Sequence, residues 1–526
     1  MKNSCLYLTL LTILGFHGES LAQQQHSGNA PRLVVSIAID QLRSDYLEAF
    51  TPLYSQNGFK RLLGQGLVYT NASYSFAPVD RASAIAALST GVPPYYNNIV
   101  GQRWLNRETL RPVWCVDDPK CPGLLTSETA SPVHLSTSTL GDELKVATDG
   151  RALVYSIAPY RDAAVLSAGH AANGALWIDD KNGEWCTSQY YCSSYPTWVK
   201  AWNDLQAPCR KIQGTTWEPV NPLVGNFSYF VQASQQKPFK HKFTGANAYR
   251  QYMASAMVNT DVTEMALQCI ASTGMGNDRV SDLLCLTYYA GNFDHQPVTD
   301  GQIELQDIYV RLDRELAQLI DAVEQKLGRD NVLFVVTSTG YSDEESADYD
   351  KFRIPTGTFY MGRTADLMNM YFGAIYGQGK YVETTFRNQI FLNHQLLEQK
   401  KISLTDATQR GQEFLALFSG VRNAYTSLQL LTSQNEQLKK TRNAFSAEHC
   451  GDLIVEVAPG WRILNEDSQE NELSRASYTP FPIIIYGGGI SAERITLPVT
   501  TDRIAPTIAR AIRIRAPNAC SAEPLF

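Results

Sequence analysis

Histidine is scarce in this sequence, with 8 residues in a chain of 526. None of them forms an H-x-x-H, H-x-H or H-E-x-x-H pattern, and no two cysteines are spaced C-x-x-C. Imidazole and thiolate ligands at such spacings are the usual signature of a zinc site. The sequence therefore offers no local motif for a metal centre.

Basic residues are fewer than acidic residues. The chain has 45 Lys and Arg against 52 Asp and Glu, a net charge of -7, and no long run of basic residues. Non-specific nucleic-acid binding needs a basic face, so we expect no nucleic-acid partner. Apolar residues make up 44% and charged residues 18%, which supplies a sizeable core and argues against a disordered chain.

An apolar run with the features of a targeting segment lies at the N-terminus. Residues 1–22 combine Lys2, an apolar run from Leu6 to Phe16 and a small residue at Ala22, the pattern of a secretory signal peptide. Residues 23–31 form a polar linker, and no later stretch is apolar enough for a transmembrane helix. We therefore expect an exported chain, periplasmic or associated with the outer envelope of a bacterium.

Cysteines are expected to pair in such an oxidising compartment. Cys5 precedes the apolar run and is set aside with the signal peptide. The candidate disulfides are Cys115–Cys121, Cys186–Cys192, Cys269–Cys285 and Cys450–Cys520. Cys209 is left without a partner in this scheme.

Buried strands and one long helix predict an α/β fold. Residues 32–40 and 331–340 are nearly continuous apolar runs, which suit strands buried on both faces of a parallel sheet. Residues 304–328 carry apolar side chains at helical spacing and end at Gly328. A last strand is expected at 481–489, followed by a closing helix.

Two less regular blocks separate these elements. Residues 105–245 are rich in Tyr, Trp, Pro and Cys, and residues 342–445 have a mostly helical pattern. Both are expected to be insertions that cap the sheet, so that 32–526 forms one domain. Within the first block, 185–202 is dense in Trp and Tyr, which either pack the cap on the core or form a surface for a partner.

Four blocks of sequence carry a family resemblance: VVSIAIDQLRSDYL, STGVPPYYNNIVGQRWLN, AGHAANGALWID and QDIYVRLDRELAQLIDAVEQKLGRDNVLFVVTSTG. In them, and over about 32 to 515, the chain resembles the alkaline phosphatase superfamily, near the monomeric bacterial phosphatases and the nucleotide pyrophosphatase/phosphodiesterases. The resemblance implies a central, mostly parallel sheet flanked by helices, with inserted cap segments. Active members hold two zinc ions about 4 Å apart by Asp and His, and a Thr or Ser attacks phosphorus.

The position that the resemblance assigns to the nucleophile holds an arginine. Relatives carry the pattern T-x-P-G-H-A-S-x-Y-T-G, and alignment on Thr90 and Gly91 places Arg81 at the attacking residue. Arginine stays protonated in proteins and is not a zinc ligand. A slip of the alignment by two residues would offer Ser83 as the nucleophile instead.

The first two ligand positions are only partly kept. Asp40, at the end of the first predicted strand, matches the first Asp ligand. In the D-x-x-x-H motif, Gly291 replaces the Asp and His295 is retained. Asp294 is a weak substitute ligand, because neighbouring side chains in regular structure point in different directions.

The remaining ligand positions are replaced. Where T-A-D-H-G is expected, Thr339 and Gly340 take the places of the Asp and the His. Pro480 takes the place of the last His, in a T-H-V-P pattern. Asp40 and His295 are thus the only ancestral ligands left, and we expect no cofactor.

The side chains at the positions that bind phosphate in the relatives are replaced as well. Gln102 stands for the Asn of G-N-x-W, and Tyr160 and Asp162 stand for the Lys and Arg of K-x-R. The loss of two cations removes stabilisation of transition-state charge, usually the largest catalytic term.

The leading hypothesis is therefore an inactive pseudophosphatase that acts as a binding or scaffold protein, with a protein or glycan partner in the envelope. The first alternative is a phosphate or sulfate ester hydrolase with a rebuilt zinc site from Asp40, Asp294, His295 and Ser83. The second is an anion- or glycan-binding protein in which Arg81, at a helix N-terminus, pairs with the ligand. Against this, Arg81 could simply form a salt bridge with Asp40 or Asp80.

Overall fold

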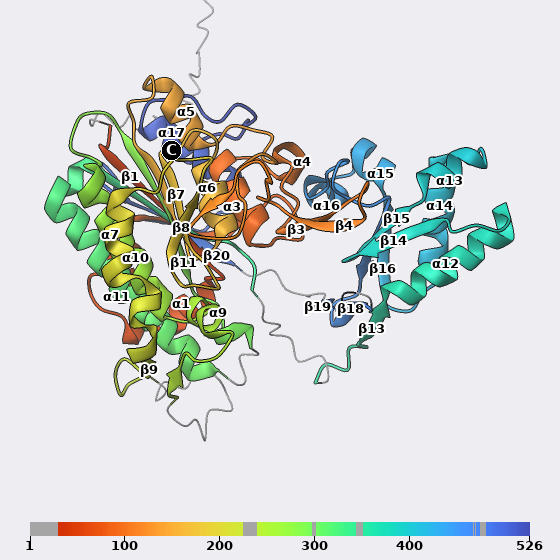
Figure 1. Cartoon of the computed structure of the whole chain (residues 1–526), viewed down its shortest axis with the longest axis horizontal. Coiled ribbons are helices and arrows are strands. Elements are labelled where there is room, and N and C mark those ends of the chain that lie inside the picture. The colour runs from red at the N-terminus through yellow and green to blue at the C-terminus, as the bar shows by residue number, and fades with distance from the viewer. Residues whose placement is uncertain are drawn as a thin grey trace, which may run out of the picture.

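The computed structural model describes residues 30–224, 239–296, 301–342, 351–466, 468, 470–473 and 480–526. The expected signal peptide at 1–22, and the linker at 23–31 apart from its last two residues, lie outside these ranges. An α/β core is built on a large mixed sheet, and an insertion module, defined as residues 351–473, projects from one side of it (Figure 1).

The central sheet has eleven strands in the order β21-β2-β20-β12-β1-β11-β6-β7-β8-β5, with β22 also paired to β2. Strands β12, β1, β11, β6 and β7 are mutually parallel, whereas β20 and β8 run antiparallel to their neighbours. The bounds are β1 Leu33–Asp40, β2 Leu67–Ser73, β5 Gly123–Leu124, β6 Val154–Ile157, β7 Gly174–Ile178, β8 Trp185–Ser188, β11 Asp282–Tyr289, β12 Val332–Ser338, β20 Phe481–Gly487, β21 Glu493–Ile495 and β22 Val499–Thr500. The expected α/β fold is confirmed.

Alternation along β1 explains why both faces of the sheet are covered. Leu33, Val35 and Ile37 point into one buried cluster, while Val34 and Ala38 point into the clusters on the opposite face. A strand buried on both sides reads as a continuous apolar run, which is why the sequence alone revealed it.

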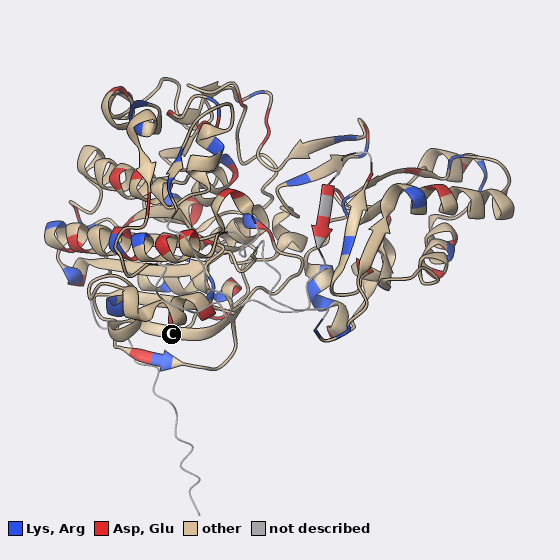
Figure 2. Ribbon diagram, turned by 90° about the horizontal axis from the view of Figure 1, so that it is seen from below, with Lys and Arg blue, Asp and Glu red and all other residues tan. Residues whose placement is uncertain are grey.

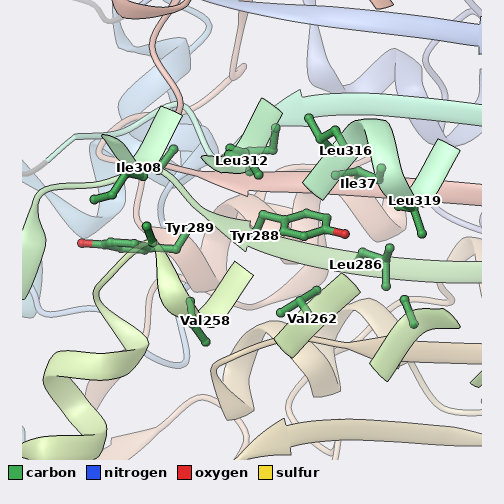
Figure 3. Close-up of a cluster of buried hydrophobic side chains, with 14 of the residues drawn as sticks. Ile37, Val258, Val262, Leu286, Tyr288, Tyr289, Ile308, Leu312, Leu316 and Leu319 are labelled. Carbon is green, nitrogen blue, oxygen red and sulfur yellow. The ribbon is translucent and has the colours of Figure 1, made fainter. Parts of the chain in front are cut away.

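Helices cover the two faces of the sheet. One face carries α1 Ser44–Ala49, α2 Phe59–Gln65, α10 Met257–Thr273 and α11 Gln302–Leu327; the other carries α3 Arg81–Thr90, α5 Leu140–Ala147, α6 Arg161–Ala168 and α17 Ile504–Ala511. On α11, Leu312 and Leu316 lie toward Ile37 of β1, and Ile308 lies on the side of Tyr289 of β11, all within one buried cluster (Figure 3). The helix predicted at 304–328 is present as α11, and the strands predicted at 32–40 and 481–489 are present as β1 and β20, so these predictions are confirmed.

The expected cap at 105–245 needs correction. Its residues supply strands β5 to β8 and helices α5 and α6 of the core itself. The error arose because these strands are short: β6 has four residues and β7 has five. Such brief apolar runs are easily missed in a segment rich in aromatic and turn residues.

The aromatic block at 185–202 lies within this region and mostly packs inward. Trp185 is fully buried, and its carbonyl accepts a hydrogen bond from the Tyr195 hydroxyl. The Tyr191 hydroxyl donates to the carbonyl of Gly169 at 3.0 Å. Packing therefore accounts for these three aromatic side chains, while Tyr190 is 38% exposed.

The second expected cap, at 342–445, is the start of a larger unit. The insertion module has its own hydrophobic core and two small sheets, ordered β13-β18-β19 and β14-β15-β17-β16. Its bounds are β13 Gly357–Tyr360, α12 Met361–Tyr376, β14 Val382–Phe386, β15 Gln389–Leu392, α13 His394–Gln399, α14 Leu404–Leu415, β16 Val421–Thr426, α15 Ser427–Thr432, α16 Lys439–Asn443, β17 Leu453–Val457, β18 Trp461–Asn465 and β19 Glu470–Leu473. The predicted end at 445 is wrong, since β17, β18 and β19 complete both sheets.

The cysteine pairing also needs correction. Every cysteine in the described part of the chain carries a free thiol, so none of the four predicted disulfides (Cys115–Cys121, Cys186–Cys192, Cys269–Cys285, Cys450–Cys520) is formed. Cys269 and Cys285 pack in clusters on opposite faces of the sheet, where no bond could join them. Cys450 lies in a cluster with Phe445 of the module, whereas the Cys520 thiol faces the carbonyl of Asp502 in the core. The spacing of the cysteines in the sequence does not show which side chains surround each thiol in the fold.

Charge is distributed evenly over the molecule. Figure 2 shows basic and acidic residues interleaved on the core and on the insertion module. Among the described helices, none is both long enough and apolar enough to cross a membrane.

Candidate functional site

Helix α3 begins at the position that the resemblance assigns to the nucleophile. Asp80 is its N-cap and accepts a hydrogen bond from the Ser83 backbone N–H at 2.9 Å, while the Asp80 N–H donates to Ser83 Oγ at 3.0 Å. This reciprocal capping box fixes the helix start. Gly91, with φ of 70°, closes the helix. Ser83 is 1% exposed and is held by the cap, so it does not face the old site as a free hydroxyl.

Arg81 stands on the first turn of α3 with its guanidinium buried between two carboxylates. Its Nε lies 3.1 Å from Asp162 Oδ1, and its Nη1 lies 3.5 Å from Asp40 Oδ2. The guanidinium carbon is 3.8 Å from the centre of the Tyr160 ring, in cation–π geometry. The side chain of Arg81 is thus held on three sides, and the residue is 8% exposed.

The charge state of Arg81 follows from this setting. Burial alone would lower its pKa, but the carboxylates of Asp162 and Asp40 outweigh that effect and hold the pKa of Arg81 well above its ordinary value. A permanent cation therefore occupies the position of the expected nucleophile.

Asp40 ends strand β1 and accepts hydrogen bonds from two hydroxyl groups. Thr339 Oγ1 donates to Asp40 Oδ1 at 2.9 Å, and the Tyr341 hydroxyl donates to Oδ2 at 3.3 Å. Thr339 Oγ1 also accepts from the Gln41 backbone N–H at 2.9 Å. Thr339, which stands where the resemblance places a metal ligand, thus donates a hydrogen bond to Asp40.

Asp162 is anchored in the same way. Gln102 Nε2 donates to Asp162 Oδ2 at 3.2 Å, and the Ala163 backbone N–H donates to Oδ1 at 2.9 Å. The backbone N–H of Gln102 donates to Asp80 Oδ2 at 2.7 Å, which ties this loop to the cap of α3. The structure therefore brings together most of the replaced positions in one network, here called the Arg81 network: Asp40, Arg81, Gln102, Tyr160, Asp162, Thr339 and Tyr341.

Two other ligand positions are filled by neighbouring side chains. A Cβ at Gly291 would lie 2.7 Å from the Tyr289 hydroxyl and 2.8 Å from the side-chain carbon of Gln41. At Gly340, where φ is 69°, a Cβ would lie 2.6 Å from the rings of Phe481 and Tyr74. A side chain at either position would therefore require these neighbours to move.

The retained histidine is not part of the network. His295 is exposed and follows Asp294 in a tight turn, with φ of 55° and 50° respectively. Asp294 accepts a hydrogen bond from Gln251 Nε2 at 3.1 Å. Pro480 is exposed, and its carbonyl accepts from the backbone N–H of Ser44 at 3.1 Å. Within the described residues, Asp40, Asp294 and His295 do not form a cluster that could hold a metal ion.

A zinc pair of the kind that the resemblance implies does not fit these residues. The described part of the chain contains no group of three or more His, Cys, Asp or Glu that could hold a metal ion. At the ligand positions, Asp40 is paired with Arg81, and the other contacts are made by hydroxyl groups and aromatic rings. No chemical step through zinc is derived for this chain.

Sequence reasoning missed two members of this region. Tyr341 lies two residues after Thr339 and supplies the second donor to Asp40. Arg387, from the turn between β14 and β15 of the insertion module, reaches Asp80 with an Nη1–Oδ2 distance of 3.9 Å. The first could have been found by asking which donors satisfy a buried carboxylate at the strand end. The second depends on how the module packs on the core.

The sequence matches the family described as type I phosphodiesterase / nucleotide pyrophosphatase over residues 34–479. The chain belongs to this family. Among its relatives, alkaline phosphatase PhoV of Synechococcus elongatus is 27% identical, with 93% of this chain and 91% of PhoV covered. Alkaline phosphatase PafA of Elizabethkingia meningoseptica is 25% identical, with 98% of both chains covered.

A crystal structure of alkaline phosphatase PafA at 1.7 Å resolution is similar to the present fold. It superposes with a TM-score of 0.81 at 25% identity, over 94% of this chain and 98% of the other. The membership of the alkaline phosphatase superfamily inferred from the sequence blocks is therefore confirmed.

Proposed function

We propose that the protein is an exported pseudophosphatase: a catalytically silent member of its family that acts as a binding or scaffold protein of the cell envelope. The observation that carries the proposal is the burial of Arg81 between Asp162 and Asp40, at the position expected for the nucleophile. A guanidinium is not a nucleophile at any pH that a folded protein tolerates.

The replacements support one another, which favours a selected inactive state over random decay. Arg81 supplies positive charge beside Asp40, where active relatives are inferred to place a metal ion. Asp162, which replaces a basic residue, supplies the second anion for Arg81. Thr339 and Tyr341 satisfy the remaining acceptor capacity of Asp40. A buried charge with these partners is stable without any ligand.

The same contacts argue against the two alternatives. A hydrolase of this kind needs a nucleophile and metal ligands at one site, whereas the Ser83 hydroxyl donates to Asp80 in the helix cap and the described residues contain no cluster that could hold a metal ion. An anion-binding role for Arg81 needs a guanidinium with open donor positions facing a ligand, whereas this one faces two carboxylates. For the partner we retain a protein or glycan of the envelope and exclude nucleic acid, on the net charge of -7 and its even distribution.

Hydrolysis assays test the proposal. The chain from residue 23 onward is purified from the envelope fraction and incubated with an aryl phosphate, an aryl phosphodiester and an aryl sulfate, with added zinc. The proposal expects no turnover above that of an Asp40→Ala variant for any of the three substrates. Turnover that the Asp40→Ala substitution abolishes would establish the rebuilt hydrolase instead.

A further inference from the structure

The insertion module is joined to the core through a polar and aromatic interface. On the core side, this interface is formed around the hairpin of β3 Arg103–Asn106 and β4 Arg111–Trp114, which lies between core and module in Figure 1. Arg107 donates to both carboxylate oxygens of Asp452 at 3.0 and 3.2 Å. Asn98 Nδ2 donates to Glu448 Oε2 at 2.8 Å.

Three rings meet at this interface. The His449 ring of the module stacks on Trp104 of β3, with ring centres 4.1 Å apart and an interplanar angle of 21°. His134, from a core loop, meets Trp104 edge-on at 5.3 Å and His449 edge-on at 6.1 Å. His449 is 6% exposed, and its buried Nε2 makes no hydrogen bond within the described part of the chain.

This environment holds His449 in its neutral form. Burial lowers the pKa of His449 to about 4; Glu448 opposes this effect and His134 adds to it. A protonated ring carries a second N–H donor, and Nε2 has no acceptor to receive it. The face of Trp104 attracts a cation, but this attraction does not replace the lost hydration of a buried charge.

Three ion pairs also cross this interface: Arg107–Asp452, Arg387–Asp80 and Arg103–Glu470. Burial raises the pKa of Asp452, but its contacts with His394 and Arg107 outweigh this and hold the pKa below its ordinary value, so this carboxylate keeps its charge on mild acidification. His394 Nε2 lies 2.9 Å from Asp452 Oδ1, so a proton on His394 strengthens that contact. Within the ring stack, His449 is the group whose protonation weakens the interface, because its buried Nε2 has no acceptor among the described residues.

We propose that His449 is a proton-operated latch: its protonation in acid releases the insertion module from the α/β core. The inference stands whether or not the protein is an enzyme. A chain with such a latch presents the core face around Trp104 in acid and conceals it at neutral pH.

The direction of the pH effect follows from the linkage between docking of the module and protonation of His449. The docked state binds fewer protons than the released state, in which the His449 pKa returns to about 6.5. Docking is complete above about pH 6.5 and weakens as the pH falls toward 4, by ~100-fold in the docking equilibrium at pH 4.

Small-angle X-ray scattering of the full chain between pH 7.5 and 4 measures the release as a rise in the radius of gyration. The wild type is expected to expand reversibly over this range, with unchanged far-ultraviolet circular dichroism. His449→Phe keeps a ring on Trp104 but takes no proton, so it should stay compact at every pH. His241→Gln, in the core beside Glu304, is the matched control and should expand as the wild type does.

A second variant keeps the test decisive if His449→Phe fails to fold. His134→Gln removes the neighbouring charge that opposes protonation of His449, so its expansion should begin at a higher pH than in the wild type. A compact wild type at pH 4, the same expansion in His449→Phe, or no shift in His134→Gln would each overturn the proposal.

Discussion

Arg81 Nε lies 3.1 Å from Asp162 Oδ1, and both residues stand where an active relative is expected to have different chemistry. The two substitutions form one ion pair across helices α3 and α6. Each is costly alone, because a buried guanidinium or a buried carboxylate without a partner loses its hydration. Together they form a buried ion pair at the position where the resemblance places a reaction centre.

Removal of Arg81 should therefore destabilise the fold strongly. Arg81→Ala leaves Asp40 and Asp162 buried beside each other without a cation, which costs about 3–5 kcal/mol in the free energy of unfolding. Urea denaturation followed by circular dichroism measures the loss. Arg494→Ala, which removes an exposed contact with Glu48, is the control and should cost less than about 1 kcal/mol. Equal stability of the two variants would contradict the buried ion-pair network.

Restoring an old ligand should fail for steric reasons. Gly291→Asp places a Cβ 2.7 Å from the Tyr289 hydroxyl and adds a carboxylate to a buried position, so we expect a large drop in melting temperature and no gain in zinc binding. Gly64→Ala is the matched control, since no atom lies within 4 Å of its Cβ. In helix α2 this change should stabilise the protein, by up to about 1 kcal/mol. A Gly291→Asp variant as stable as wild type would show that the ligand position is open.

The His170–Asp142 contact predicts a pH dependence of stability. His170 Nδ1 lies 2.9 Å from Asp142 Oδ2, and its backbone N–H donates to Oδ1 at 2.8 Å. The hydrogen bond to Asp142 raises the pKa of His170, although burial opposes it. The stabilisation is therefore full below the unfolded value of about 6.5 and is lost as the pH rises through the folded pKa. Nuclear magnetic resonance titration of His170 should give a pKa above 6.5, and Asp142→Asn should lower it; an unshifted His170 would refute the contact.

Long periodic elements were predictable from the sequence, and short ones were not. The strand that ends at Asp40 and the helix at 304–328 each carry enough apolar residues to show their period. Strands β6 and β7 are too short for that, and the disulfides depended on surroundings that spacing does not encode.

At the site, the sequence identified the replaced positions but not all of their contacts. The interpretation that Arg81 pairs with Asp40 is confirmed, whereas Asp80 caps α3 and does not bind the guanidinium. The sequence showed that Asp162 stands in place of a basic residue. That Asp162 is the main partner of Arg81 became clear only from the packing of α6 on α3. A contact between residues far apart in the chain arises from tertiary structure, and a single sequence read by itself does not reveal it.

The central claim is that Arg81 and its carboxylate partners occupy the old reaction centre. Equilibrium dialysis of the purified, metal-free protein against zinc, followed by metal analysis by mass spectrometry, tests it most directly. The account predicts no stoichiometric zinc in the wild type, and the same metal content in an Asp40→Ala variant. One or two zinc ions per chain, lost on Asp40→Ala, would contradict it.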